Sequence, residues 1–142
     1  MHDLNNEDDL REAIELLYFA YREFTAGPDR ILAQRGLNRA HHRILYFVGR
    51  NDRISVNALL ELLAVSKQAL NAPLRQLVAM ELISNASAEG DRRRKELCLT
   101  AEGRKLERRL TGTQMKQLEK VFDDAGREAT NGWRRIMRGM RD

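Results

Sequence analysis

Apolar residues recur at three- and four-residue intervals along most of this 142-residue chain, which is the spacing of an amphipathic α-helix. Residues 7–24 show it first, and Asn5 or Asn6 is placed to cap the helix that the spacing predicts. Further apolar side chains extend the apolar face of this helix around most of its circumference. We therefore expect a partner subunit to cover part of it. Gly27 and Pro28 predict its end.

A helix, a turn and a second helix are predicted in the middle of the chain. Asn38 is placed to cap a helix that reaches about Gly49, and Ser55 to cap a short helix with inward-facing leucines. After a short link, Ser66 caps a further helix whose leucines share one face. Pro73 lies inside that helix, where we expect a kink or a loosened turn because proline has no backbone N–H. The arrangement is a helix-turn-helix.

The pattern then changes to strand-like alternation. Residues 83–87 and 95–100 are short enough for strands, and the connector 88–94 between them contains a glycine and three arginines. Alternation places Leu97 and Leu99 on the same face of the second strand. The prediction is a β-hairpin with an arginine-rich tip.

Two further helices complete the chain, one from Ala101 to Ala125 with Gly126 as its stop, and one from Arg127 to Met140. The predicted fold class is mainly α with a small β-hairpin wing. Residues 1–37 are expected to form an N-terminal dimerisation helix and linker, 38–100 a winged helix-turn-helix region, and 101–142 C-terminal dimerisation helices. The expected dimer interface includes Leu10, Ile14, Leu17, Tyr21, Trp133, Ile136 and Met137.

Charge divides the chain unevenly. The net charge of +4 includes −6 in residues 1–29 and +5 in residues 30–60, and 20 of the 25 basic residues are arginines. Planar guanidinium groups suit phosphates and base edges, although a solvated basic surface explains the same composition. The lone cysteine, Cys98, excludes an internal disulfide framework and favours a reducing, cytoplasmic location. No apolar run approaches the roughly 20 residues that a membrane span needs.

A helix-turn-helix followed by a basic hairpin is the order that a winged helix needs to bind DNA. The second helix of the pair fits the major groove, and the hairpin can reach phosphates or the neighbouring minor groove. Each part is a weak signal alone, but together with helical flanks at both ends they are fairly specific.

A family resemblance rests on VSKQAL at residues 65–70, LRQLVAMELI at 74–83 and above all GDRRRKELCLTAEGRKL at 90–106. In these stretches the chain resembles the MarR family of dimeric winged-helix transcription regulators. The resemblance implies a homodimer that binds double-stranded DNA at a palindromic operator, as a repressor, and that can respond to a small-molecule effector held in an apolar cleft.

The resemblance also implies individual DNA contacts. It assigns the major groove to side chains of the second helix, and the minor groove to Arg93, oriented by Asp91. Arginine fits guanine, glutamine and asparagine fit adenine, and a narrow minor groove attracts a guanidinium group. The complete DNA-binding set is Ser55, Ser66, Lys67, Gln68, Asn71, Arg75, Asp91, Arg92, Arg93 and Arg94.

Two positions depart from the family pattern. Glu81 stands where the family usually has a glycine that closes the recognition helix, and a left-handed backbone there would cost roughly 1 to 2 kcal/mol. We therefore expect this helix end to be built differently. Pro73 puts the register of Arg75 against bases in question, whereas Lys67 to Asn71 lie upstream of it.

An enzyme and a protein-binding adaptor are the competing classes of function. The chain has no phosphate-cradling glycine loop, no GxSxG turn and no HExxH pair, so no enzyme, cofactor or metal site is expected. An adaptor would more often show aromatic anchors where this chain has its polar stripe and arginines. His41 and His42 are candidate effector-binding residues or hydrogen-bonded helix residues, and Cys98 is a redox sensor or a packing residue.

Overall fold

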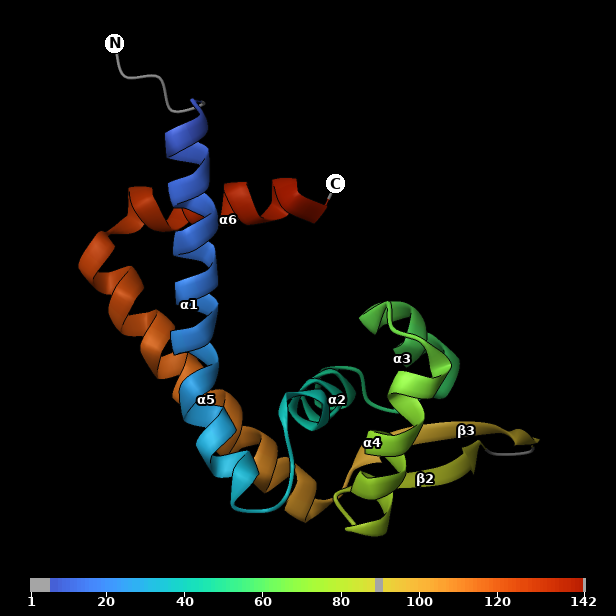
Figure 1. Ribbon diagram of the computed structural model, residues 1–142. Coiled ribbons are helices and arrows are strands. Elements are labelled where there is room, and N and C mark those ends of the chain that lie inside the picture. Colours follow the sequence, from blue (N-terminus) through green and yellow to red (C-terminus); the bar gives the residue numbers. More distant parts are fainter. Residues whose placement is uncertain (1–5, 89–90, 142) are drawn as a thin grey trace.

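The computed structural model describes residues 6–88 and 91–141, with the side chains of residues 87–94 left out. The elements in chain order are α1 (Glu7–Ala33), α2 (Arg39–Arg50), β1 (Ile54–Ser55), α3 (Val56–Leu63), α4 (Lys67–Ala79), β2 (Ile83–Ala88), β3 (Asp91–Leu99), α5 (Ala101–Ala125) and α6 (Arg127–Arg141). The long helices α1 and α5 pack on each other and α6 crosses behind α1, while α2 to β3 form a winged lobe to one side (Figure 1). The predicted fold class, mainly α with a small β wing, is confirmed.

Local capping explains where the helices begin. At each start from α1 to α5, a side-chain oxygen accepts a hydrogen bond from a backbone N–H two or three residues later, which satisfies a donor that the helix itself leaves open. The caps are Asn6 (2.9 Å), Asn38 (2.9 Å), Ser55 (3.1 Å), Ser66 (3.0 Å) and Thr100 (3.0 Å). The starts predicted at Asn6, Asn38, Ser55 and Ser66 are therefore confirmed.

The end predicted for the first helix is wrong. α1 continues through Gly27 and Pro28 to Ala33. Pro28 cannot donate to the carbonyl of Phe24, and that loss would normally break a helix. Here the side-chain amide of Gln114 on α5 donates to the Phe24 oxygen at 3.3 Å, so the carbonyl keeps a partner. This compensating hydrogen bond comes from a residue far away in the chain, so local sequence patterns do not predict it.

The core lies inside the winged lobe and at its junction with α1 and α5. Burying a leucine fully contributes about 1.5 to 3 kcal/mol relative to exposing it, and leucine dominates the cluster. α4 contributes Leu70, Leu74 and Leu77, as its spacing predicts. The other buried members are Leu32, Leu37, Ile44, Leu45, Val48, Leu59, Leu82, Ile83, Leu97, Leu99, Leu106 and Leu110.

The wing sheet has three strands in the order β1-β3-β2, all antiparallel. The sequence pattern does not predict β1, because a strand of two residues is too short to show an alternation of apolar and polar side chains. It pairs Ile54 with Leu97, while β2 pairs Ile83 with Leu99. The hairpin strands reach further than predicted, to Ala88 and from Asp91, so the expected connector 88–94 is largely strand backbone.

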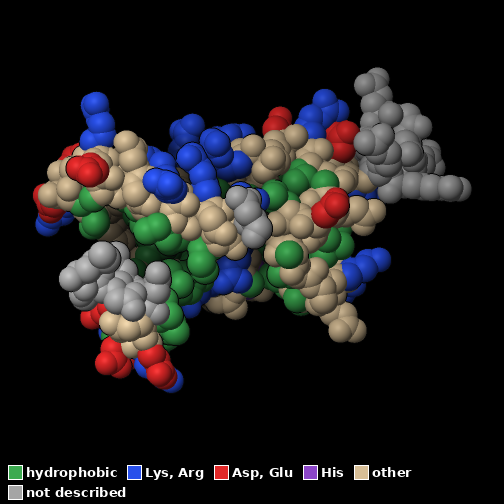
Figure 2. Space-filling model, turned by 90° about the horizontal axis from the view of Figure 1, so that it is seen from above, with side chains coloured by type: hydrophobic (Ala, Val, Ile, Leu, Met, Phe, Trp, Pro, Cys, Tyr) green, Lys and Arg blue, Asp and Glu red, His purple; other side chains and the backbone are tan. Residues whose placement is uncertain are grey.

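Large apolar side chains remain exposed on the terminal helices. Ile14 of α1 is 67% exposed and Ile136 of α6 is 69% exposed, and the described residues of α6 include no buried side chain. Seen from above, hydrophobic side chains line a hollow, and many of the lysines and arginines of this face lie above it in the view (Figure 2). Across residues 6–88 and 91–141, no helix is long and apolar enough to cross a membrane.

Candidate nucleic-acid interface

A sharp turn separates α3 from α4. Ala64 ends α3 in the left-handed region, with φ 53° and ψ 42°, which redirects the chain so that Ser66 can cap α4. Ser55 and Ser66, both in the predicted DNA-binding set, use their hydroxyl oxygens as caps for α3 and α4. These two hydroxyls therefore stabilise the first turns of α3 and α4.

The predicted base-reading side chains lie on one side of α4. Lys67, Gln68 and Arg75 are exposed and Asn71 is partly buried, while the leucines of the same helix face the core. The helix runs from Lys67 to Ala79 with Pro73 inside it, and the kink or loosened turn expected at Pro73 stays a prediction. The row from Lys67 to Arg75 covers about two and a half helical turns and contains two cationic and two amide side chains.

Gln76 is exposed beside Arg75 on α4 and also contacts the neighbouring helix α2. Its Oε1 lies 2.8 Å from Nε2 of His41 on α2. Because Gln76 follows Arg75 by one residue, it points about 100° further round the helix. Gln76 thus borders the polar row on the side of α4 where its amide oxygen contacts α2.

The end of α4 is built on a left-handed residue after all. Glu81 has φ 59°, and the N–H of Leu82 donates to the carbonyl of Leu77 at 2.9 Å while the N–H of Glu81 donates to Val78 at 3.0 Å. This pair of bonds is a Schellman motif, which normally places glycine where Glu81 stands. The expectation of a different helix end is wrong, because the motif is retained and only its residue type has changed.

The start of α5 locks this end in place. The hydroxyl of Thr100 donates to the carbonyl of Glu81 at 2.6 Å and accepts from the N–H of Gly103. A Cβ on Gly103 would lie 1.9 Å from the carbonyl oxygen of Leu82, so only glycine fits there. The recognition helix, the wing and the long helix α5 therefore share one tightly packed corner.

An ion pair ties the base of the wing to the turn before it. Nε of Arg53 donates to the Glu96 carboxylate at 2.7 Å, and this bond raises the pKa of Arg53. Nearer the start of β3 than Glu96 lie four residues of the predicted DNA-binding set, Asp91, Arg92, Arg93 and Arg94. Their strand backbone is described, but their side chains lie outside the described residues.

Cys98 lies on the same strand and is partly buried. Burial raises the pKa of its thiol, and a hydrogen bond with Asp52 raises it further. Since the thiolate is the reactive form, these surroundings disfavour a redox-sensing role. Within the described part of the chain, no group of three or more His, Cys, Asp or Glu side chains could hold a metal ion.

Comparison with known proteins identifies the family. A family model described as MarR family matches residues 35–94, from the link before α2 into β3. The HTH-type transcriptional regulator PetP of Rhodobacter capsulatus is 40% identical over 136 residues, which cover 96% of this chain and 82% of that protein. The chain belongs to the MarR family. It is accordingly a transcriptional regulator and not an enzyme.

Solved structures of MarR proteins share the fold. A Staphylococcus aureus MarR in complex with salicylate and kanamycin aligns with a TM-score of 0.78 at 18% identity, covering 95% of this chain and 91% of that one. A Staphylococcus aureus MepR-DNA complex aligns with a TM-score of 0.72 at 20% identity, covering 89% and 93%. At these identities the likeness concerns the fold alone.

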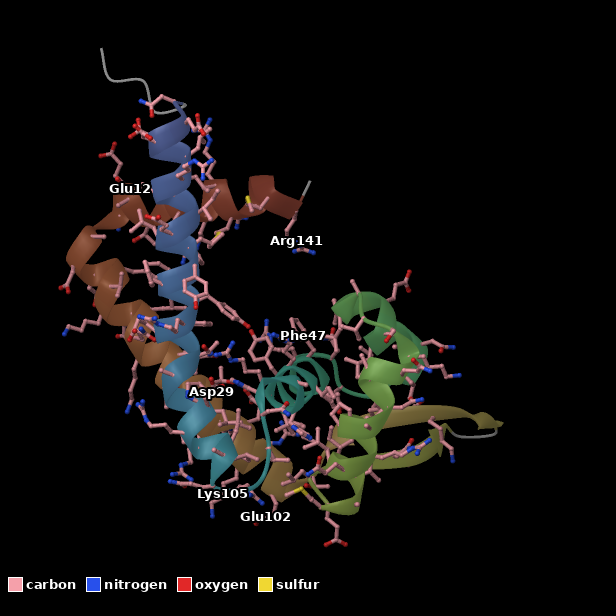
Figure 3. All side chains as sticks on the ribbon, in the orientation of Figure 1. Glu12, Asp29, Phe47, Glu102, Lys105 and Arg141 are labelled. Carbon is pink, nitrogen blue, oxygen red and sulfur yellow. The ribbon has the colours of Figure 1, made fainter. Side chains whose placement is uncertain are left out.

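This MarR-family chain also has a cleft of about 320 Å³ between α1, α2 and α5. In its lining, Arg39 pairs with Asp29 at 3.0 Å and lies over the ring of Tyr21. The hydroxyl of Tyr21 accepts a hydrogen bond from Arg43 at 3.0 Å. Asp29 lies on the side of α1 that faces α2 (Figure 3). Sequence patterns do not single out this pairing, since it joins helices that are separate in the chain.

The two adjacent histidines have separate surroundings. His42 lines the cleft, and its Nε2 lies 3.2 Å from the hydroxyl of Thr111 on α5. That hydroxyl donates to the Glu107 carboxylate, so its oxygen is left to accept a hydrogen bond from Nε2–H of His42. Burial lowers the pKa of His42 despite the opposing carboxylates of Glu107 and Asp29. His41 instead points to α4.

Proposed function

We propose that this MarR-family regulator binds double-stranded DNA in a sequence-specific manner, with α4 in the major groove. The observation that supports it most is the exposed row of Lys67, Gln68, Asn71 and Arg75 on a helix whose other face is anchored by buried leucines. Arginine can bind guanine through two hydrogen bonds, and amide side chains can do the same with adenine. A rigidly held row of such groups suits direct reading of base edges.

The wing would add contacts that depend less on sequence. Residues 91–95 read DRRRK, and β3 presents this basic stretch at the outer end of the sheet (Figure 1). Following the family pattern, we assign Arg93, oriented by Asp91, to the minor groove and Arg92 and Arg94 to the backbone. A narrow minor groove concentrates negative potential, which favours an inserted guanidinium group.

We further propose that the protein acts as a homodimer formed by its terminal helices. The exposed apolar side chains of α1 and α6 would then be buried between two copies. Charge supports the pairing, because the first half of α1 is acidic and α6 is rich in arginine. The acidic residues are Glu7, Asp8, Asp9, Glu12 and Glu15, and the arginines are Arg127, Arg134, Arg135, Arg138 and Arg141.

A two-fold dimer predicts a palindromic operator. Its two recognition helices would meet successive major grooves about 10 base pairs apart on one side of the duplex. Following the family resemblance, we propose that the bound dimer represses transcription and that it acts in the cytoplasm.

Selection from a random duplex library tests this function directly. The purified protein should enrich an inverted repeat, and light scattering of the complex should give two chains for each selected duplex. Recovery of sites without inverted symmetry would contradict the dimeric arrangement. Binding of all duplexes with equal affinity would instead favour the alternative, a winged-helix adaptor for protein contacts.

A small-molecule effector is a further part of the proposal. The cleft combines aromatic side chains with Arg39 and Arg43, a lining that suits a small aromatic anion, and His42 lies within it. Calorimetry with salicylate as the probe tests this. Heat of binding that disappears in Arg43→Met supports the cleft, whereas no heat, or unchanged heat in the variant, speaks against it.

A further inference from the structure

His41 connects the helix α2 to the recognition helix α4. Its side chain is 4% exposed, and both ring nitrogens have partners. Nδ1 accepts a hydrogen bond from the backbone N–H of Asn38 at 3.0 Å, and Nε2 lies 2.8 Å from Oε1 of Gln76. An imidazole ring has two nitrogens, so the hydrogen bonding of this ring is complete.

The two contacts fix the state of the ring. Nδ1 can accept only if it has no proton, so the neutral ring must hold its proton on Nε2, which then donates to the Gln76 oxygen. The first contact closes a capping box at the start of α2, in which the N3 side chain normally comes from glutamate or glutamine. Histidine at this position accepts the same capping hydrogen bond, and its second nitrogen also contacts α4.

The hydrogen bond between His41 and Gln76 constrains the orientation of α4. Leu70, Leu74 and Leu77 hold the helix against the core by apolar contact, which has little directional preference. A hydrogen bond on the flank of the helix is directional and weakens steeply when its angle or length changes. The bond from α2 to Gln76 therefore resists rotation of α4 about its own axis, the movement that would most displace the base-reading stripe.

We propose that His41 is a positioning residue for DNA recognition: through Gln76 it sets the rotation of α4 and thereby the aim of Gln68, Asn71 and Arg75. This inference rests on the proposed reading of DNA by α4. It adds a residue that does not touch DNA and lies outside the DNA-binding set assigned from the sequence.

The test compares wild type, His41→Asn, Gln76→Leu and the double variant. Asparagine at position 41 keeps an acceptor near the position of Nδ1 for the N–H of Asn38 but is too short to reach α4, and leucine at position 76 removes the bond without changing charge. The quantity measured is the ratio of the Kd for random duplex to the Kd for the selected operator, at one salt concentration. Circular dichroism and thermal unfolding establish that every variant is folded at the temperature used.

We expect each single variant to lower this ratio about tenfold, the upper range for loss of one hydrogen bond. The double variant should fall no further, since both substitutions remove the same bond. Gln76→Glu should keep the wild-type ratio, because a carboxylate oxygen also accepts from Nε2, although its charge weakens binding to all duplexes. Gln34→Leu, at an exposed glutamine at the end of α1, is the matched control and should leave the ratio unchanged.

Two results overturn the positioning role while leaving the proposed function intact. One is an unchanged ratio in both single variants of a protein that still prefers its operator. The other is a double variant whose loss is the product of the single losses, since that indicates two independent effects. A wild-type protein with no preference for any duplex overturns the proposed function itself, and the positioning role falls with it.

Discussion

Glu81 holds a backbone conformation that its side chain disfavours. The left-handed φ of 59° costs a residue with a Cβ roughly 1 to 2 kcal/mol, whereas glycine adopts it freely. The Schellman bonds to Leu77 and Val78 and the Thr100 hydroxyl bond to the Glu81 carbonyl hold the conformation in place. The hydrogen bonds at the end of the recognition helix thus offset the strain of this one residue.

Glu81→Gly should therefore stabilise the protein. We expect the free energy of unfolding, measured by urea denaturation, to rise by about 0.5 to 1 kcal/mol, since the gain at the turn is partly offset by the greater freedom of glycine in the unfolded chain. Ala79→Gly, two residues earlier in right-handed helix, is the matched control and should lower stability by about 1 kcal/mol. Destabilisation by both substitutions would contradict the account of the turn.

His42 makes stability depend on pH. Burial lowers its pKa in the folded protein below the ordinary value near 6.5, so the unfolded chain binds a proton first as the pH falls. The stabilisation is fully present above about pH 6.5 and decreases as the pH falls towards the lowered pKa, by at most about 1.4 kcal/mol per pH unit.

Denaturation at about pH 7.5, 6.5 and 5.5, which brackets the ordinary histidine pKa, measures this effect. The free energy of unfolding of wild type should fall more steeply over the lower pH interval than that of His42→Gln, which retains a donor for Thr111 but cannot titrate. Parallel pH profiles of the two proteins would show that His42 does not have the lowered pKa.

At the scale of elements, the sequence predicts what is local. Helix α4 follows from a serine cap and leucines at helical spacing, and α5 follows from its periodicity and the glycine at 126. The end of α1 could not be predicted, because the amide that compensates for Pro28 comes from Gln114, 90 residues from the carbonyl that it binds. Strand β1 could not be predicted either, because its two residues form a strand only by pairing with β3.

In the candidate site, too, local features can be predicted from the sequence and contacts between distant residues cannot. The polar row on α4 is a periodic feature of one helix and can be predicted residue by residue. The bond between His41 and Gln76 joins residues 35 positions apart, and the ion pair between Arg53 and Glu96 joins residues 43 apart. Such contacts depend on how elements pack, so a single sequence indicates the surface that meets a ligand better than the contacts that hold that surface.

Helix α4 and the wing should affect DNA binding differently. Gln68→Ala or Asn71→Ala removes base-edge hydrogen bonds, so operator affinity should fall by about 1 to 3 kcal/mol while random DNA is bound nearly as before. Arg93→Ala or Arg94→Ala removes a positive charge near the backbone. Each should weaken binding to every duplex and reduce the slope of log K against log salt by roughly 0.9 for each phosphate that the variant no longer neutralises.

Titration of binding against salt for both sets of variants separates the two roles. Wild type and Gln68→Ala should share one slope, and Arg94→Ala should have a shallower one. If the arginine variants keep the wild-type slope, the tip of the wing is a solvated turn and DNA is bound by α4 without it.

At the scale of the whole molecule, α5 connects the surface that we propose binds DNA with the surface that we propose forms the dimer. Its N-terminal end packs against the wing and the end of α4 through Gly103, and the helix then runs beside α1 to α6. Both α1 and α6 expose apolar side chains that a lone chain leaves in water. A dimer formed there would set the separation of the two recognition helices, because one continuous helix connects each of them to the interface.

Ile136→Glu tests that connection. The side chain is 69% exposed on α6, so a charge costs the isolated chain little but would be buried against the partner. We expect light scattering to report a monomer, and operator affinity to fall by about a hundredfold or more, because two half-sites no longer act through one linked molecule. Leu62→Glu, at a leucine on α3 that is 46% exposed, is the matched control and should stay dimeric. A dimer that persists in Ile136→Glu and also in Ile14→Glu would move the interface away from the terminal helices, and the spacing of the operator half-sites would then need another structural origin.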